Sequence, residues 1–252
     1  MTGKEVRLRR IFRDGKAFIA ALDFGGFMGP IRGIEDPSII VQKVVSGGAD
    51  AIIVNPGIAR SEWPTYAAQC ALIMRITGGM TRYGSKIPCH TLICSVEDAV
   101  ALGADAVCAM VFIGLSEEQT MFRNLASIIA SASRLGIPVI AEVIPADASR
   151  YFDHECISVC ARVGYEIGAD VIKTYYTGEG FGEIIRSCRV PIVIAGGPKT
   201  DDPVKMAKSA LGYGACGIAF GRNVFEASDP EATARELHEA VHGSSGEKGA
   251  KG

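Results

Sequence analysis

A lysine inside an apolar run is the first residue of this sequence that could do chemistry. Lys173 lies in the segment ADVIKTYY. Side chains alternate along a strand, so Val171, Lys173 and Tyr175 should share one face. If that face points into the core, poor solvation favours the neutral amine, which can attack a ketone and form an iminium. An iminium is an electron sink for breaking or making the adjacent C–C bond. The alternative is a lysine that reaches the rim or pairs with a carboxylate.

Two carboxylates in other apolar runs could assist such a reaction. Asp23 ends the run AFIAALD, and Glu142 lies in PVIAEVIP. Asp23 could orient substrate hydroxyls, move protons or hold the lysine, or it could form a structural ion pair. An unpaired carboxyl in so apolar a setting should have a raised pKa, which suits acid–base catalysis by Glu142. The alternative is that Glu142 is a buried partner of Lys173 or Arg75.

Two glycine-rich segments could bind an anion. Gly196 and Gly197 follow the apolar run PIVIA, and Gly221 and Arg222 follow GIAF. Glycine allows backbone N–H groups to approach an anion closely, and arginine adds charged, forked donors. The two segments predict a phosphate site.

These residues need strands that end at one place in the fold. Short apolar runs rich in Val and Ile alternate with segments of helical spacing, such as Glu117–Leu135, His154–Ile167 and Asp202–Leu211. Such runs are typical of parallel strands that are buried on both faces. The predicted strands are Ala17–Phe24, Ala51–Asn55, Ala71–Thr77, Ala106–Ile113, Pro138–Pro145, Asp170–Tyr176, Pro191–Gly196 and Gly217–Gly221.

An internal repeat supports this alternation. GGADAIIV, LGADAVCAM, IGADVIKTY and YGACGIAF each place a helix-ending glycine before a strand, at the second, fourth, sixth and eighth predicted strands. Eight strands in one series predict an α/β fold, a single-domain (β/α)8 TIM barrel over residues 1–243 with an N-terminal extension. Residues 244–252 are expected to form a flexible polar tail. In such barrels the active site lies where the strands end, and the last two loops often bind phosphate.

Composition excludes several classes of protein. The 252 residues carry a formal net charge of -2, with 48% apolar and 21% charged residues, which gives no general attraction to nucleic acid or acidic membranes. No apolar run approaches the roughly 20 residues that span a bilayer. Eight scattered cysteines without a CxxC pair indicate reduced thiols in a cytoplasmic protein.

Three motifs resemble metal or dinucleotide sites but fit poorly. His238 to His242 reads HEAVH, yet it lies on the last predicted helix, away from the barrel mouth and with no evident third ligand. GEGFG at 178–182 is one residue short of the dinucleotide fingerprint. Cys156 and Cys160 have the spacing of one packed helix face. We therefore expect no metal and no cofactor.

The segments VIKTYYTG, AGGPKT, GIAFGRNVF and NPGIAR together resemble the archaeal-type class I fructose-bisphosphate aldolase group. This group belongs to the wider class I aldolases that include deoxyribose-phosphate aldolase. The resemblance runs from LRRIFRDGK to GRNVFEASDP, nearly the whole chain. It implies that Lys173 is the Schiff-base lysine, that Asp23 lies in the substrate site, and that no cofactor is needed. It also implies a large homo-oligomer, with the phosphate of a sugar substrate bound by Gly196, Gly197, Gly221 and Arg222.

The chain departs from the pattern of the group at two positions. The group usually has Asp-His-Gly after the first strand, and this chain has Phe24 at the place of the histidine. The fructose-bisphosphate enzymes carry an acid–base Tyr before Pro on the fifth strand, where this chain has Ile144. Glu142, two residues earlier on the same face, could substitute. Fructose-bisphosphate cleavage is the leading hypothesis. The alternatives are a thiolase or transferase acting on another phosphorylated keto compound, since the group includes a dideoxy-heptulosonate synthase and a thiolase for a phosphorylated pentanedione, or a binding protein without catalysis.

Overall fold

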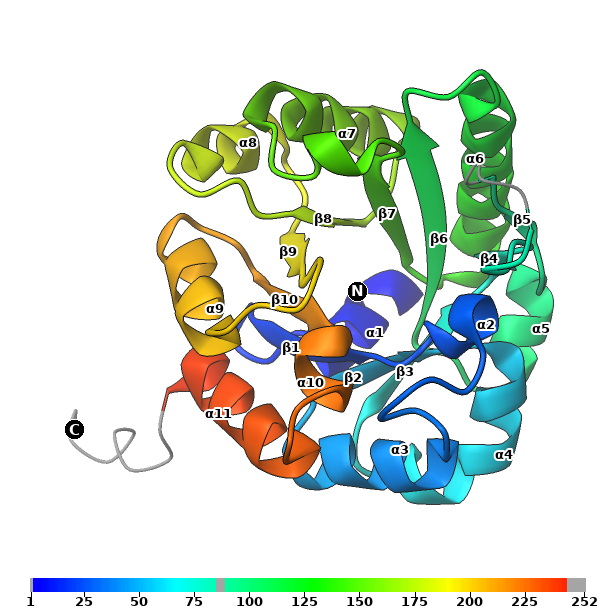
Figure 1. The fold of residues 1–252 in the computed structure, drawn as a ribbon. Helices are drawn as coiled ribbons and strands as arrows, with labels where there is room; N and C mark the ends of the chain where they lie inside the picture. Colours follow the sequence, from blue (N-terminus) through cyan, green and yellow to red (C-terminus); the bar gives the residue numbers. More distant parts are fainter. Residues whose placement is uncertain (1, 85–88, 244–252) are drawn as a thin grey trace.

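Eight short apolar segments form a closed parallel barrel, which confirms the predicted (β/α)8 fold (Figure 1). The computed structural model describes residues 2–84 and 89–243, so the predicted tail at 244–252 lies outside the described residues. Neighbours round the ring follow the chain order, and the last strand closes against the first. The barrel strands are β1 (Ala17–Ala21), β2 (Ala51–Val54), β3 (Ala71–Arg75), β6 (Ala106–Ile113), β7 (Val139–Pro145), β8 (Val171–Tyr175), β9 (Ile192–Ala195) and β10 (Gly217–Phe220).

One predicted strand is divided in the structure. The prediction of a continuous strand Ala71–Thr77 is wrong, because β3 ends at Arg75 and Thr77 begins a separate antiparallel pair, β4 (Thr77–Gly78) with β5 (Thr91–Leu92). Ile76 bridges the two sheets: its N–H donates to Cys108 of the barrel, and its carbonyl accepts from Ile93 near the pair. The chain thus leaves the barrel wall directly after Arg75.

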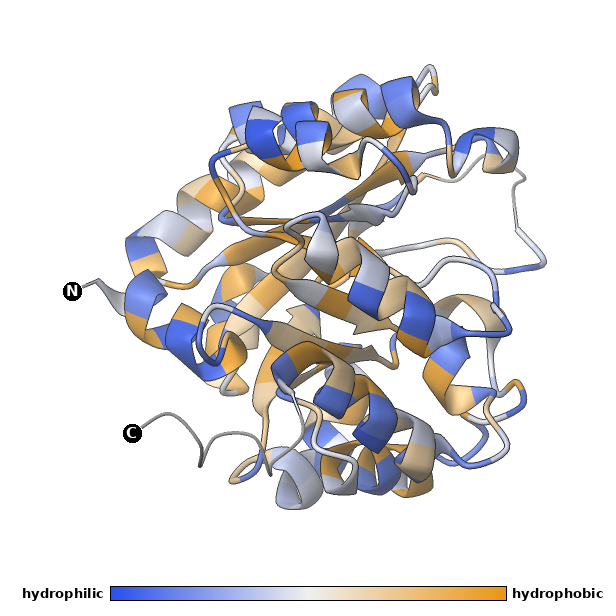
Figure 2. Ribbon diagram, turned by 90° about the vertical axis from the view of Figure 1, so that its left-hand side faces the viewer, coloured by the Kyte–Doolittle hydropathy of each residue, from blue (hydrophilic) through white to orange (hydrophobic). Residues whose placement is uncertain are grey.

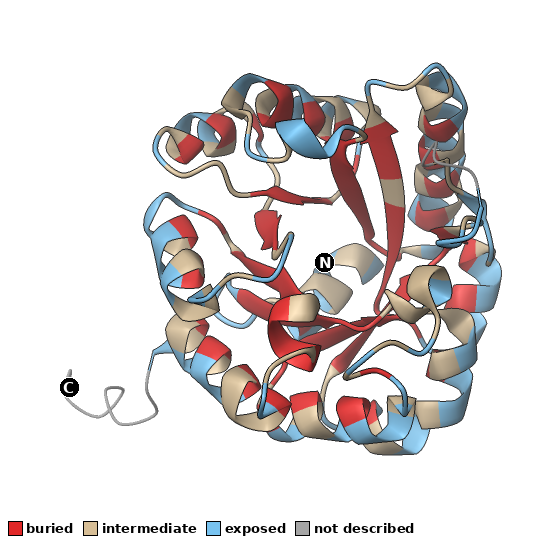
Figure 3. Cartoon of the chain, in the orientation of Figure 1, coloured by how far each residue is buried: buried red, intermediate tan, exposed pale blue. Residues whose placement is uncertain are grey.

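Helices surround the barrel and bury their inner faces against it (Figure 3). Asp202 and Asp229 cap two helices, each with Pro at the first helical position, as the sequence predicts. The helices are α1 (Gly3–Ile11), α2 (Gly25–Met28), α3 (Pro37–Ser46), α4 (Pro56–Tyr66), α5 (Val96–Ala101), α6 (Glu118–Leu135), η1 (Ala148–Arg150), α7 (His154–Ile167), α8 (Phe181–Ser187), α9 (Pro203–Gly212), α10 (Arg222–Phe225) and α11 (Pro230–His242).

The barrel interior is built from small and β-branched side chains, and the strands are hydrophobic along their length (Figure 2). Val171 belongs to this inner cluster, so Lys173 and Tyr175, at the same strand parity, also face inward. Six of the inner side chains are only methyl groups, which leave room at the centre: Ala17, Ala21, Ala51, Ala71, Ala106 and Ala219.

The N-terminal extension closes the lower end of the barrel. Helix α1 lies across the central opening of the ring of strands (Figure 1). Its Ile11 is fully buried in the inner cluster, and Leu8 and Phe12 pack beside that cluster. Three of the internal repeats carry an aspartate just before their strand. Each aspartate binds both a backbone N–H of the adjoining strand and a basic side chain of the extension. The backbone bonds run from Phe18 to Asp50 (2.7 Å), Leu72 to Asp105 (3.2 Å) and Val139 to Asp170 (2.9 Å). The ion pairs are Arg13–Asp50 (3.1 Å), Arg10–Asp105 (2.9 Å) and Lys4–Asp170 (2.8 Å).

Two further features of the chain are the state of its cysteines and the length and polarity of its helices. All eight cysteines are free; Cys156 and Cys160 are buried together on α7, as expected for a packed helix face. Within residues 2–84 and 89–243, no helix is both long and apolar enough to cross a membrane.

Candidate active site

Lys173 projects from β8 into the barrel, where only 5% of its side chain is exposed. Its partner across the β7–β8 pairing is Glu142, and the Lys173 Nζ lies 2.8 Å from Glu142 Oε1. The sequence left two alternatives for Lys173, a poorly solvated lysine in the core and a lysine paired with a carboxylate. In the structure both descriptions hold, because the buried lysine is paired with Glu142. The pair fixes the amine at the third residue of a five-residue strand, close to the barrel mouth.

Glu142 joins two buried cations. Its second oxygen, Oε2, accepts a hydrogen bond from Nη2 of Arg75 on β3. Burial alone would raise the pKa of Glu142, but the charges of Lys173 and Arg75 and their hydrogen bonds lower it to about 2. The raised pKa expected for an unpaired carboxyl therefore has the wrong sign here. Glu142 is a carboxylate at neutral pH and cannot serve as a proton donor in the resting site.

Asp23 extends this chain of charges to the end of β1. Its Oδ2 accepts from Nε of Arg75 at 2.6 Å, and its side chain is 15% exposed. Asn55, which follows β2, donates from Nδ2 to the backbone carbonyl of Asp23 at 2.7 Å. Four side chains from four strands or strand ends thus alternate in charge. We call them the charged cluster: Asp23, Arg75, Glu142 and Lys173.

His90, which lies just before β5, also faces the charged cluster. Burial and, after it, the positive charge of Arg75 lower the pKa of His90 to about 4, while Glu142 and Asp23 act in the opposite direction. Its ring packs edge-on against Phe112, with centroids 5.3 Å apart. His90 Nδ1 and Arg75 Nη1 are buried without a hydrogen-bond partner, so a polar substrate could satisfy both. No periodicity or motif around His90 predicts this position.

Two tyrosines lie above Lys173. Tyr175 faces inward two residues further along β8, and its ring centroid is 4.5 Å from that of Tyr151, which follows η1. Burial, followed by the neighbouring Tyr151 and Glu142, raises the pKa of Tyr175 far above its ordinary value. Tyr175 therefore presents a neutral hydroxyl. Tyr151 escaped the sequence analysis because it lies beyond the strand end where the Tyr of the related enzymes is expected.

The two glycine-rich loops lie together, as predicted. Arg222 Nη2 donates to the carbonyl of Gly197 at 2.8 Å, and Asn223 Nδ2 donates to that of Gly196 at 3.1 Å. A β-carbon on Gly197 would lie 3.4 Å from the Tyr175 ring, and one on Gly221 would lie 2.7 Å from the carbonyl oxygen of Ala21. The loops therefore approach β8 on one side and β1 on the other. We call them the phosphate loops, residues 196–197 and 221–222, after the ligand that the sequence predicts for them.

Phe24, which stands where the related group has a histidine, contacts the side chain of Arg222. The Arg222 guanidinium carbon lies 5.3 Å from the centroid of the Phe24 ring, within the range of a cation–π interaction. Since Phe24 directly follows Asp23, this contact links the charged cluster to the phosphate loops.

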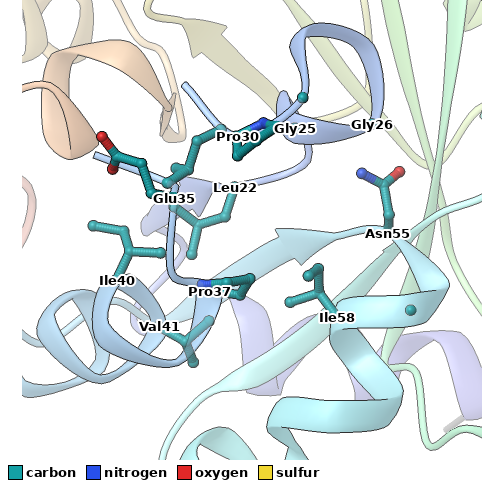
Figure 4. A pocket seen from close by; sticks show the side chains of 13 residues that line it. Leu22, Gly25, Gly26, Pro30, Glu35, Pro37, Ile40, Val41, Asn55 and Ile58 are labelled. Atoms are coloured by element: carbon teal, nitrogen blue, oxygen red, sulfur yellow. The ribbon is translucent and has the colours of Figure 1, made fainter. Parts of the chain in front are cut away.

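A separate, largely apolar cavity of about 360 Å³ lies between the loop after β1 and helices α3 and α4 (Figure 4). Asn55 lies at one end of it, and Glu35 lies across the cavity (Figure 4). None of the four residues of the charged cluster lines this cavity. The bond from Asn55 to the backbone of Asp23 connects the wall of this cavity with the active site.

Comparison with known proteins gives the family. Residues 17–227 match the model of the DeoC/LacD family aldolases. The chain is 35% identical over 245 residues to 2-amino-3,7-dideoxy-D-threo-hept-6-ulosonate synthase 1 of Archaeoglobus fulgidus, covering 96% of this chain and 92% of that one. It is 35% identical over 244 residues to 3-hydroxy-5-phosphonooxypentane-2,4-dione thiolase of Yersinia pseudotuberculosis, covering 95% and 82%. A solved structure of a Schiff-base-forming fructose-1,6-bisphosphate aldolase superposes with a TM-score of 0.86 at 34% identity, covering 95% of this chain and 99% of that one. With a family model matched over most of its length and relatives of this similarity, the chain belongs to the DeoC/LacD aldolase family.

Proposed function

We propose that this protein is a class I aldolase that breaks or forms a C–C bond in a phosphorylated ketose, with Lys173 as the Schiff-base residue and fructose bisphosphate as the leading substrate. The observation that carries the proposal is the buried Lys173–Glu142 pair, held inside the barrel near the phosphate loops. The similar Schiff-base-forming aldolase structure supports the same chemistry.

In the first step, the Lys173 amine attacks the keto carbon. The nitrogen must first lose a proton, and Glu142 Oε1, at 2.8 Å, is positioned to take it. Once Lys173 is neutral, one of the two charges that depress the Glu142 pKa is gone, so the carboxylate becomes a stronger base at the moment it is needed. The carbinolamine then loses water to give the iminium, and the re-formed carboxylate stabilises this cation.

In the second step, the bond between C3 and C4 of the ketose breaks. Its electron pair moves into the iminium to give an enamine, and the C4 hydroxyl loses its proton as the aldehyde forms. Asp23 is suited to accept this proton because it is the more exposed carboxylate of the charged cluster. Protonation of the enamine at C3 and hydrolysis of the resulting iminium release the ketone and regenerate Lys173.

The substrate phosphate binds at the phosphate loops. Arg222 is held in place by the Gly197 carbonyl and the Phe24 ring, so its guanidinium is oriented before substrate arrives. Because binding at a remote phosphate positions the keto carbon against Lys173, this site should contribute to turnover as well as to affinity.

Borohydride trapping tests the proposal. The protein is incubated with dihydroxyacetone phosphate and sodium borohydride, and tryptic peptides are mapped by mass spectrometry. We expect a single reduced adduct on Lys173, absent from Lys173→Met and retained in Lys205→Met, which alters an exposed lysine of α9. An adduct elsewhere, or none with any phosphorylated ketone, would rule out the mechanism.

The second candidate is a thiolase or transferase acting on another phosphorylated keto compound. Ile144 favours it, because a residue without a titratable group stands where the fructose-bisphosphate enzymes place their acid–base tyrosine. The Archaeoglobus fulgidus and Yersinia pseudotuberculosis relatives also support it. A panel of phosphorylated ketoses and diketones, with and without a thiol acceptor, separates the two candidates. Binding without turnover of any compound would instead indicate a phosphosugar-binding barrel.

We also propose that the protein is cytoplasmic and forms a large homo-oligomer. Large apolar side chains on outer helices, Ile39 on α3 and Trp63 on α4, are 52% and 60% exposed and provide surface for subunit contacts. Light scattering coupled to size-exclusion chromatography measures the assembly, and a monomer would contradict this part of the proposal.

A further inference from the structure

The two histidines of the HEAVH segment meet a third potential metal ligand at the lower end of the barrel. His238 and His242 lie one turn apart on α11, and their ring centroids are 4.7 Å apart. Asp50, fully buried just before β2, lies beside them, and one ligand atom from each residue falls within 4.8 Å of the others. We call these three residues the basal cluster.

Both the basal cluster and the active site contain buried polar atoms that lack a hydrogen bond. Within the described residues, four buried side-chain atoms have no hydrogen-bond partner. Two of them lie in the active site: Arg75 Nη1 belongs to the charged cluster, and His90 Nδ1 lies beside it. A polar substrate could satisfy both atoms. The other two, Asp50 Oδ1 and His238 Nδ1, belong to the basal cluster; Asp50 Oδ1 has no hydrogen bond there, but it forms the ion pair with Arg13 at 3.1 Å. Buried polar atoms without a hydrogen bond are rare, and a bound ion is one arrangement that satisfies them.

We propose that Asp50, His238 and His242 form a binding site for a divalent transition-metal ion of the zinc type. Two imidazole nitrogens and one carboxylate oxygen suit Zn²⁺ and its borderline neighbours Co²⁺, Ni²⁺ and Cu²⁺, whereas Mg²⁺ and Ca²⁺ prefer oxygen alone.

The geometry is close to that of a metal site. At Zn–N distances of 2.0–2.1 Å, donors of a tetrahedral site are roughly 3.3 Å apart. His242 Nε2 and Asp50 Oδ2 are already 2.7 Å apart and share a hydrogen bond, so the metal would replace the shared proton. All separations are within 4.8 Å, so the widest must shrink by at most about 1.5 Å for a metal to bind.

The surroundings of Asp50 also resemble those of a metal-binding carboxylate. The Phe18 N–H donates to Oδ2 at 2.7 Å and fixes the carboxylate orientation, as outer-shell partners of ligands do. Arg13 Nε lies 3.1 Å from Oδ1, but its side chain is 56% exposed, so it can turn into solvent when a cation enters.

The proposed ion would act on stability rather than on catalysis. Asp50 precedes β2, whereas the active site lies where the strands end, so the basal cluster and Lys173 are at opposite ends of the barrel. A metal there would tie the last helix to the second strand, and ligands that bind only the folded state raise its melting temperature.

The test is metal titration of the full-length protein after removal of bound metal with a chelator. We expect one equivalent of Zn²⁺ by calorimetry and a higher Tm. Two variants should weaken binding by at least roughly 10–100-fold, the loss that even outer-shell changes cause. They are His238→Ala and His242→Gln, the second of which keeps a hydrogen-bond donor towards Asp50. His154→Gln, in a partly exposed histidine of α7, is the control and should bind normally.

Co²⁺ distinguishes the basal cluster from cysteine sites. The proposed donor set gives a d–d spectrum without a thiolate charge-transfer band. A thiolate band would place the metal on a cysteine such as Cys70, whose pKa is raised mainly by burial and also by Asp105 and Asp50. That result, unchanged binding in both histidine variants, or no binding to the wild-type chain would each overturn the proposal.

Discussion

Replacing Glu142 by Gln should affect stability and catalysis together, because this carboxylate holds two buried cations. The variant keeps the shape of the side chain but removes its charge, leaving Lys173 and Arg75 without their common partner. Breaking a buried ion pair in this way typically costs about 3–5 kcal/mol.

The pKa gives a second route to the magnitude. The Glu142 pKa falls from its ordinary 4.5 to about 2 in the folded protein. At about 1.4 kcal/mol per pH unit, this corresponds to about 3 kcal/mol of stabilisation at neutral pH. A carboxyl whose pKa is lowered by folding stabilises the fold above its unfolded pKa and loses that contribution as the pH falls towards its folded pKa. The stabilisation should therefore be complete above roughly pH 5.5 and fall to about 1 kcal/mol at pH 3.

Urea denaturation followed by circular dichroism measures the effect. At pH 7, Glu142→Gln should lower the free energy of unfolding by about 3–5 kcal/mol. The deficit should shrink as the pH is lowered from 5 to 3. Glu166→Gln is the matched control: Glu166 pairs with Arg162 on α7, but both side chains are more than half exposed, so no measurable change is expected.

Two results would refute the reasoning. One is a deficit at pH 7 no larger than that of Glu166→Gln. The other is a deficit that does not change with pH, because it would come from packing and not from charge. Coupling gives a further check: Lys173→Met should cost less in the Glu142→Gln background than in the wild type. In the aldolase assay, Glu142→Gln should lose roughly 100-fold or more in kcat, the usual contribution of a positioned proton-transfer group.

Three further predictions follow from other parts of the site. Arg222→Lys should raise KM for a phosphorylated substrate roughly 10-fold and leave KM for the unphosphorylated analogue unchanged. The reason is that a lysine cannot both donate to the Gly197 carbonyl and lie flat on the Phe24 ring. An equal rise in KM for both substrates would contradict this prediction. His90→Gln should reduce the loss of stability that the wild type shows between pH 6.5 and pH 4. Burial lowers the His90 pKa to about 4 in the folded protein, so the unfolded chain takes up the proton first and is favoured as the pH falls. If the Tm of the variant and of the wild type fell in parallel over this pH range, the prediction would be excluded. Gly221→Ala should lower the free energy of unfolding by about 1–3 kcal/mol and weaken phosphate binding, because its methyl group would lie 2.7 Å from the Ala21 carbonyl oxygen. In the control Gly212→Ala the methyl group meets nothing within 4 Å, so stability should not change. Thermal melts of the two variants measure the difference.

The strands could be predicted because each is a local apolar run. Parallel strands buried on both faces leave a strong signal, and the repeated glycine before alternate strands fixed their order. Strand ends were less certain: Thr77 continues the apolar pattern of β3, but the β4–β5 pairing that removes it depends on residues 91–92, far along the chain.

The candidate site was predictable where it follows strand ends and not where it depends on partners. Lys173 lies within a recognisable strand, and the phosphate loops directly follow two others. The sign of the Glu142 pKa depends on two cations from other strands, so a single sequence leaves it open. His90 and Tyr151 lie in connections whose course is set by tertiary packing, and no local pattern reports that course.

The three aspartates that hold the N-terminal extension have a consequence for the order of assembly. Helix α1 precedes the barrel strands in the chain, yet Asp170, which binds Lys4, lies 166 residues after Lys4. The extension can complete its anchoring only after β7 and α7 have been synthesised. Until then, the apolar ends of the nascent strands are uncovered on the side that Ile11 later seals. Helix α1 is thus synthesised before the barrel strands but is among the last elements to dock, and a fusion partner on its N-terminal side that restrains it should slow the final stage of folding while leaving the barrel mouth unaltered.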